Sequence, residues 1–75
     1  MSDDYAQIVQ DLYASEINAR LEWFYDGGFS VSIGDMLMGW KATNNFRTLA
    51  EAMDWLRAEA IKRYPASAFA KKYRQ

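Results

Sequence analysis

The chain has 75 residues, of which 10 are acidic and 9 are basic, so its formal net charge is −1. Hydrophobic residues make up 51% and charged residues 25%, which is typical of a globular domain and not of a disordered chain. The absence of cysteine and histidine excludes a disulfide framework, a thiolate zinc site and histidine-based acid–base catalysis. Residues 1–75 are expected to form one domain, because a chain this short supports a single core.

The segment 4–14 predicts an amphipathic helix, capped by Ser2, Asp3 or Asp4. The expected buried stripe consists of residues spaced along one helical face, namely Tyr5, Ile8, Val9 and Leu12. Tyr13 lies beside this stripe and widens it.

Residues 17–33 predict a β-hairpin, because apolar and polar side chains alternate along both halves. The first strand, 17–25, directs its apolar side chains to one face: Ile17, Ala19, Leu21, Trp23 and Tyr25. Asp26-Gly27 indicates a type I′ turn. In the second strand, 29–33, Val31 is expected to join Trp23 in the core, and Ser30 and Ser32 are expected to point outward.

A third strand is expected over 40–44, with Trp40 and Ala42 on the core face. Thr48 and Glu51 have the spacing of a capping box, which starts a helix over 49–63 that ends before Pro65. The buried stripe of this helix is expected to be Leu49, Met53, Leu56 and Ala60. Residues 66–75 are expected to form a short C-terminal helix or a tail.

These elements predict an α+β fold in the order α-β-β-β-α. The strands form a three-stranded antiparallel meander, and two helices pack on one of its faces. The other face of the sheet is expected to be wet or bound to a partner.

The element order resembles the double-stranded RNA-binding domain over most of the chain. That family grips phosphates with basic residues at the start of its last helix, where this chain has Thr48-Leu49-Ala50-Glu51 and only Arg47 beside it. The loop after the first strand is Asp26-Gly27-Gly28, which lacks the proline and histidine of the family. The binding residues of the family therefore do not carry over.

The local sequence over 17–73 is similar to small uncharacterised bacterial proteins, some of them associated with phages or prophages. The resemblance rests on Trp23-Phe24-Tyr25-Asp26-Gly27-Gly28-Phe29, Thr48-Leu49-Ala50-Glu51-Ala52 and Tyr64-Pro65. It implies a fold unit and a bacterial source, without an activity.

Catalysis is not expected, since no base is available to activate Ser30 or Ser32. The acidic residues lack metal-loop spacing and are interpreted as capping and turn residues, so neither a metal nor a cofactor is expected. The N-terminal residues show no targeting signal, and no apolar run approaches the length of a membrane span. The protein is therefore expected in the cytoplasm, with no membrane partner.

Binding to a protein partner or to a second copy is the first functional hypothesis. Its expected anchors are apolar residues that the core pattern leaves over: Phe24, Met36, Leu37, Met38 and Trp55. The Met36–Met38 segment has an equally simple alternative, which is to fold over one end of the core.

Weak binding of nucleic acid is the alternative hypothesis. Residues 1–35 carry a net charge of −6 and residues 36–75 a net charge of +5. The bases near the C-terminus are interleaved with aromatics: Lys62, Arg63, Lys71, Lys72 and Arg74. Neutralisation between the two halves and matching to helix dipoles are simpler interpretations of the same charges, and the sequence favours them.

Overall fold

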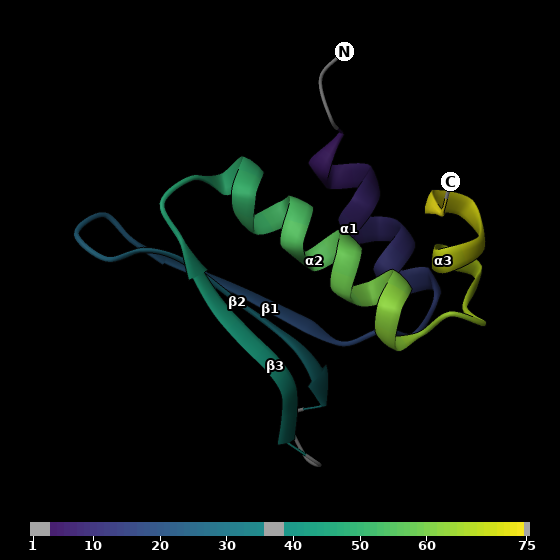
Figure 1. Ribbon diagram of the computed structural model, residues 1–75. Helices are drawn as coiled ribbons and strands as arrows, with labels where there is room; N and C mark the ends of the chain where they lie inside the picture. The colour runs from purple at the N-terminus through teal and green to yellow at the C-terminus, as the bar shows by residue number, and fades with distance from the viewer. Residues whose placement is uncertain (1–3, 36–38, 75) are drawn as a thin grey trace.

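The computed structural model describes residues 4–35 and 39–74, which form a layer of helices on a layer of strands (Figure 1). The elements in chain order are α1 (Tyr5–Ala14), β1 (Ala19–Phe24), β2 (Gly28–Asp35), β3 (Gly39–Phe46), α2 (Leu49–Arg63) and α3 (Ala68–Tyr73). The strands pair antiparallel in the order β1-β2-β3, and the helices lie on one face. The predicted α+β meander is confirmed.

Helix α1 begins where the sequence allows a cap. The Asp4 side chain accepts a hydrogen bond of 3.0 Å from the backbone N–H of Gln7, which satisfies one of the free donors of the first turn. After Ala14 the chain reverses through Glu16, whose φ of 61° lies in the left-handed region. This turn directs the chain into the sheet.

The β1–β2 hairpin closes through a different turn from the predicted type I′. Such a turn requires positive φ at both Asp26 and Gly27, but the positive φ of 85° occurs one residue later, at Gly28. The backbone N–H of Gly27 donates to the carbonyl of Phe24 at 2.9 Å, and Gly28 then joins β2. The loop is therefore one residue longer than the Asp-Gly pair alone suggests.

Helix α2 carries the predicted capping box. The Thr48 hydroxyl accepts from the backbone N–H of Glu51 at 3.2 Å, and the Glu51 carboxylate accepts from the backbone N–H of Thr48 at 3.3 Å. The helix ends at Arg63, two residues before Pro65. Its predicted stripe is confirmed for Met53, Leu56 and Ala60, which are buried, whereas Leu49 is half-buried at the first turn.

The core lies where α2 crosses the central strand. Val31 and Ile33 of β2 are fully buried, and α2 packs on β2 and β3. Ile8 and Leu12 of α1 and Phe69 of α3 complete the cluster. Ala52 and Ala60 are also fully buried, and their small side chains leave room for neighbouring elements to approach α2 closely.

The C-terminal segment is a helix that docks on the domain. Phe69 of α3 is 1% exposed and stacks on Tyr73 with ring centres 4.4 Å apart. Its backbone N–H donates to Ser15 Oγ at 2.9 Å, and the Ser67 hydroxyl caps α3 by accepting from the N–H of Ala70. Thus α3 bridges α2 and the end of α1.

Candidate functional site

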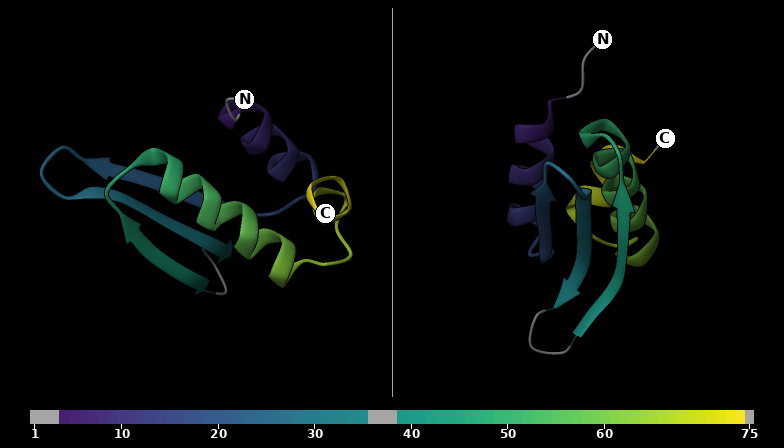
Figure 2. Two further views of the ribbon diagram at one scale, coloured as in Figure 1. Left: turned by 45° about the horizontal axis from the view of Figure 1, so that its top comes forward. Right: turned by 90° about the vertical axis from the view of Figure 1, so that its left-hand side faces the viewer.

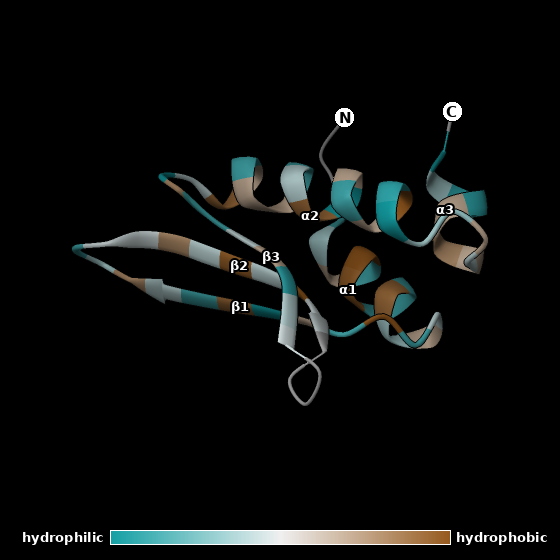
Figure 3. Ribbon diagram, turned by 60° about the horizontal axis from the view of Figure 1, so that its bottom comes forward, coloured by the Kyte–Doolittle hydropathy of each residue, from teal (hydrophilic) through white to brown (hydrophobic). Residues whose placement is uncertain are grey.

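Strand β1 forms one edge of the sheet, and nothing in the described part of the chain pairs with its outer side (Figure 3). The Asn18 carbonyl accepts from the backbone N–H of Gly34 at 2.9 Å, so the backbone groups of residue 18 point toward β2. Because these directions alternate along an antiparallel strand, the N–H and C=O groups of Ala19, Leu21 and Trp23 point away from β2. We refer to these outward groups as the β1 edge.

The opposite edge of the sheet is irregular. Ile33 pairs with Ala42 and Gly34 with Trp40, which leaves Lys41 as an extra residue in β3. Gly34, with φ of 136°, permits the bulge, because a Cβ at this position would lie 2.5 Å from the Lys41 nitrogen. A bulge bearing a lysine hinders pairing of β3 with a further strand, and β1 carries no such protection.

An apolar groove of about 240 Å³ lies beside the β1 edge, between α1 and β1. Its apolar lining is Val9, Leu12, Tyr13, Ala19, Leu21, Met53 and Leu56. Val9 is 50% exposed and Tyr13 81% exposed. Trp23 follows Leu21 on the same sheet face and is 65% exposed. We refer to this feature as the α1–β1 groove.

The predicted core positions of Val9, Tyr13, Trp23 and Tyr25 are wrong. α1 packs on α2 and lies at the β1 side of the sheet, while α2 covers β2 and β3 (Figure 2). The far end of the hairpin projects beyond the helices (Figure 1), so the apolar face of β1 has no cover there. The alternation correctly predicted which side chains share a face, but not how far the helices extend over it.

The face of the sheet opposite the helices, called the open face below, is largely polar. The Arg20 guanidinium lies 4.9 Å from the ring centre of Trp40 and 3.9 Å from the Glu22 carboxylate. Trp40 was predicted on the core face, and the extra residue Lys41 turns it to the open face instead. Ser32 is on this face as predicted, but it is only 1% exposed and hydrogen-bonds with Thr43 at 2.9 Å.

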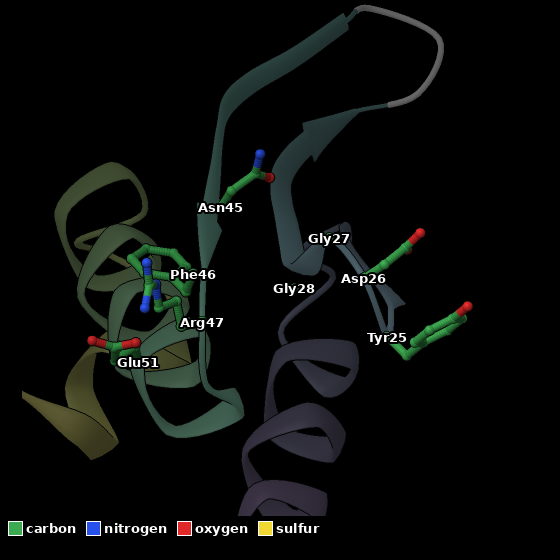
Figure 4. A pocket seen from close by; sticks show the side chains of 8 residues that line it. All are labelled: Tyr25, Asp26, Gly27, Gly28, Asn45, Phe46, Arg47 and Glu51. Atoms are coloured by element: carbon green, nitrogen blue, oxygen red, sulfur yellow. The ribbon is translucent and has the colours of Figure 1, made fainter.

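A second hollow lies at the hairpin tip, with a volume of about 740 Å³ (Figure 4). Tyr25 and Asp26 point away from Arg47 and Glu51 across it (Figure 4). The Glu51 carboxylate is already engaged in the capping box of α2. The polar groups around this wide hollow therefore do not point toward one place. In a site for a small ligand, by contrast, a few polar groups converge on the ligand.

Of the predicted interaction anchors, the structure describes Phe24 and Trp55, and it places them on different surfaces. Phe24 is 66% exposed. It lies on the open face, because alternate residues of a strand share a face and Arg20 and Glu22 point to that face. Trp55 is half-buried against Phe46, with ring centres 6.0 Å apart, so it contributes to packing at the rim of the core. Met36, Leu37 and Met38 lie outside the described residues.

The predicted nucleic-acid-binding residues are partly engaged within the fold. Lys72 Nζ lies 2.8 Å from Asp11 Oδ2, and Arg63 Nε lies 2.7 Å from Glu59 Oε1. Arg74 donates to the Pro65 carbonyl at 3.5 Å. Lys62 and Lys71 are exposed. Of these contacts, only the Lys72–Asp11 pair joins the basic half of the chain to the acidic half, and nucleic-acid binding stays a prediction.

Among the acidic side chains that the structure describes, Asp11 has the pKa that the fold shifts most. Hydrogen bonds from Lys72 and then from the Tyr73 hydroxyl, at 2.5 Å, lower its pKa from 3.8 to about 2. Burial and then the hydrogen bond to Asp11 raise the pKa of Tyr73 to about 12. The contact between Asp11 and Tyr73 joins α1 to α3. This structural contact accounts for the shifted pKa values of both groups.

The lowered pKa of Asp11 predicts a specific acid sensitivity. The unfolded chain binds this proton near pH 3.8 and the folded chain near pH 2, so the stabilisation is present above about pH 4 and declines toward pH 2. Asp11→Asn should remove this part of the pH dependence of the unfolding free energy. Denaturant titrations between pH 2 and pH 6 test this, with Asp54→Asn as the control, and an unchanged Asp11→Asn profile would contradict it.

Within residues 4–35 and 39–74, no three acidic side chains gather closely enough to hold a metal ion. No helix among the same residues is long and apolar enough to cross a membrane.

Comparison with known proteins gives no relative. No protein-family model matches the chain, and no curated protein or solved structure is significantly similar to it. The likeness to small bacterial and phage-associated proteins therefore stays a prediction. Functional inference for this chain rests on its own geometry.

Sequence reasoning missed the residues that make the β1 edge and the α1–β1 groove. Val9, Tyr13, Leu21 and Trp23 follow helical and strand periodicity, and such periodicity assigns apolar residues to the core. One signal did point to an exposed apolar surface: twelve aromatic residues are many for a 75-residue domain to bury.

Proposed function

We propose that this chain is a non-catalytic binding domain that holds an extended protein segment along β1. The segment would add to the sheet as a further strand, and its side chains would enter the α1–β1 groove. The single observation that carries the proposal is the regular β1 edge, which no described residue pairs with, beside an apolar groove. The proposal keeps the cytoplasm as the compartment expected from the sequence.

The backbone of β1 supports this mode of binding. Ala19, Leu21 and Trp23 direct alternating N–H and C=O groups to one side, which is the arrangement that an added antiparallel strand requires. Such hydrogen bonds give affinity with little sequence preference. The strand contains no proline and no bulge that would prevent the addition.

The side chains of the α1–β1 groove support selection among segments. Tyr13 and Val9 form an exposed wall on α1, and Met53 and Leu56 of α2 lie at the inner side. Trp23 extends the apolar surface toward the hairpin tip. Aromatic residues and methionine are the types that protein interfaces favour, and Val9 and Tyr13 line one groove and are not scattered singly over the surface.

The titratable groups support a role without catalysis. Enzymes shift the pKa values of the groups that exchange protons with substrate. Asp11 and Tyr73 have clearly shifted pKa values. The hydrogen bond between them lowers the pKa of Asp11 and raises the pKa of Tyr73. Both belong to the contact that ties α3 to α1, which is a structural role.

Ala19→Pro tests the proposal. Proline removes the outward N–H of residue 19 but spares pairing with β2, because position 19 begins the strand and its N–H faces solvent. Random peptides displayed on phage should yield extended apolar binders, and these should bind Ala19→Pro about tenfold more weakly than the parent chain. Ala19→Ser, which keeps the N–H, should bind as the parent does.

Amide NMR titrations with the selected peptides would locate the binding. Shifts should concentrate on β1 and on Val9 and Tyr13 of α1. Selection of no peptide, or selection of peptides that bind Ala19→Pro and the parent equally, would contradict the proposed function.

A further inference from the structure

We infer that the segment held along β1 is β1 of a second copy of this chain, so that the two sheets join into one. This inference rests on the proposed function and names its partner. The pattern of side chains along Ala19–Phe24 is the observation that carries it, because this strand is complementary to itself in one antiparallel register.

That register places a two-fold axis at Leu21. Leu21 then faces Leu21 of the second copy, and Ala19 faces its Trp23. The backbone groups of these residues already point outward, so each facing pair can exchange two hydrogen bonds. A shift by one residue would oppose side chains that belong to different faces and leave the outward groups unmatched.

Several registers would bring the outward backbone groups of the two β1 strands into hydrogen-bonding pairs, and the charged side chains favour the one with its axis at Leu21. With the axis at Leu21, Arg20 of one copy lies opposite Glu22 of the other, and the symmetry repeats the pair. A shift by two residues in either direction places Arg20 opposite Arg20, or Glu22 opposite Glu22. Opposite charges directly across a pair of strands stabilise it, and like charges destabilise it.

The α1–β1 groove fits the same arrangement. An axis perpendicular to the sheet places the helices of both copies on one face. Trp23 of the second copy then faces Ala19, whose small side chain lines the groove of about 240 Å³. The indole would lie against Tyr13 and Val9, which are exposed in the single chain. One contact thus covers three of the exposed apolar side chains.

A charge-reversal pair tests the register. Arg20 and Glu22 are both half-exposed, so reversing either charge leaves the fold of the single chain intact. Arg20→Glu places two acids opposite each other in its own dimer, and Glu22→Arg places two bases opposite each other. Each variant alone should self-associate about tenfold more weakly than the parent chain.

Mixing the two variants provides the decisive comparison. In the mixed dimer the introduced glutamate of one copy faces the introduced arginine of the other, and the retained Glu22 faces the retained Arg20, so both cross-strand pairs are attractive again. Sedimentation equilibrium should show parent-like association in an equimolar mixture and weaker association in each solution alone. Association that is equal in all samples, or a mixture no stronger than its components, would overturn the inference.

A third variant tests the apolar part of the contact, and the parent chain itself separates this inference from the proposed function. Trp23→Ser removes an exposed side chain and should weaken self-association about thirtyfold, while the circular dichroism of the single chain is unchanged. If the parent chain is monomeric at every concentration but still binds selected peptides at the β1 edge, the partner is not a second copy and the proposed function stands. If it neither associates nor binds peptides, both are wrong.

Discussion

Phe69→Ala should lower the free energy of unfolding by about 3–4 kcal/mol, the cost of removing a buried aromatic ring from a packed core. Phe69 is 1% exposed, contacts the main cluster and stacks on Tyr73. The variant would leave a cavity between α2 and α3 and weaken the attachment of α3. Denaturant unfolding at fixed protein concentration measures the change.

Tyr13→Ala provides the control for this prediction. Tyr13 is an aromatic residue of similar size but 81% exposed, so its loss should change the unfolding free energy of the single chain by less than about 0.5 kcal/mol. A Phe69→Ala variant as stable as Tyr13→Ala would show that residues 68–73 form a tail and not a docked helix.

Gly28→Ala should lower the free energy of unfolding by about 2–3 kcal/mol. A Cβ at position 28 would lie 2.5 Å from the Phe46 carbonyl oxygen, and φ of 85° is strained for any residue with a side chain. Phe46 cannot move freely to relieve the contact, because it pairs with Phe29 and leads directly into the capping box of α2.

Gly27→Ala is the matched control in the same loop. A Cβ at position 27 would lie 3.6 Å from the Phe24 Cβ, an ordinary contact, and its φ is not positive. This variant should change the unfolding free energy by less than about 0.5 kcal/mol. Equal effects of the two substitutions would contradict the turn described for the hairpin.

Local sequence patterns predicted the elements because each depends on near neighbours. The capping box at Thr48 needs only Glu51, three residues away, and the alternation in 29–33 needs only the pleat of a strand. The same local rules misplaced Trp40, because the bulge at Lys41 depends on how Gly34 pairs across the sheet. They also misplaced the hairpin turn. There, a side chain at position 28 would collide with the carbonyl oxygen of Phe46, which is distant in the sequence.

The candidate site was less predictable than the fold. Periodicity identifies which side chains share a face, and it placed Leu21 and Trp23 together. Whether that face is covered depends on the position of α1 and the reach of α2, which are long-range properties. The complementarity of Arg20 and Glu22 across a two-fold axis is readable in the sequence only once Ala19–Phe24 is known to be an edge strand.

Amide hydrogen exchange along β1, in dilute and in concentrated solution, tests the central claim most directly. The N–H groups of Arg20 and Glu22 point toward β2, so they should be protected at both concentrations. Those of Leu21 and Trp23 point outward, so they should exchange quickly in dilute solution and become protected as the protein is concentrated. Rapid exchange of Leu21 and Trp23 at every concentration, beside protected Arg20 and Glu22, would contradict pairing of β1 with a second copy.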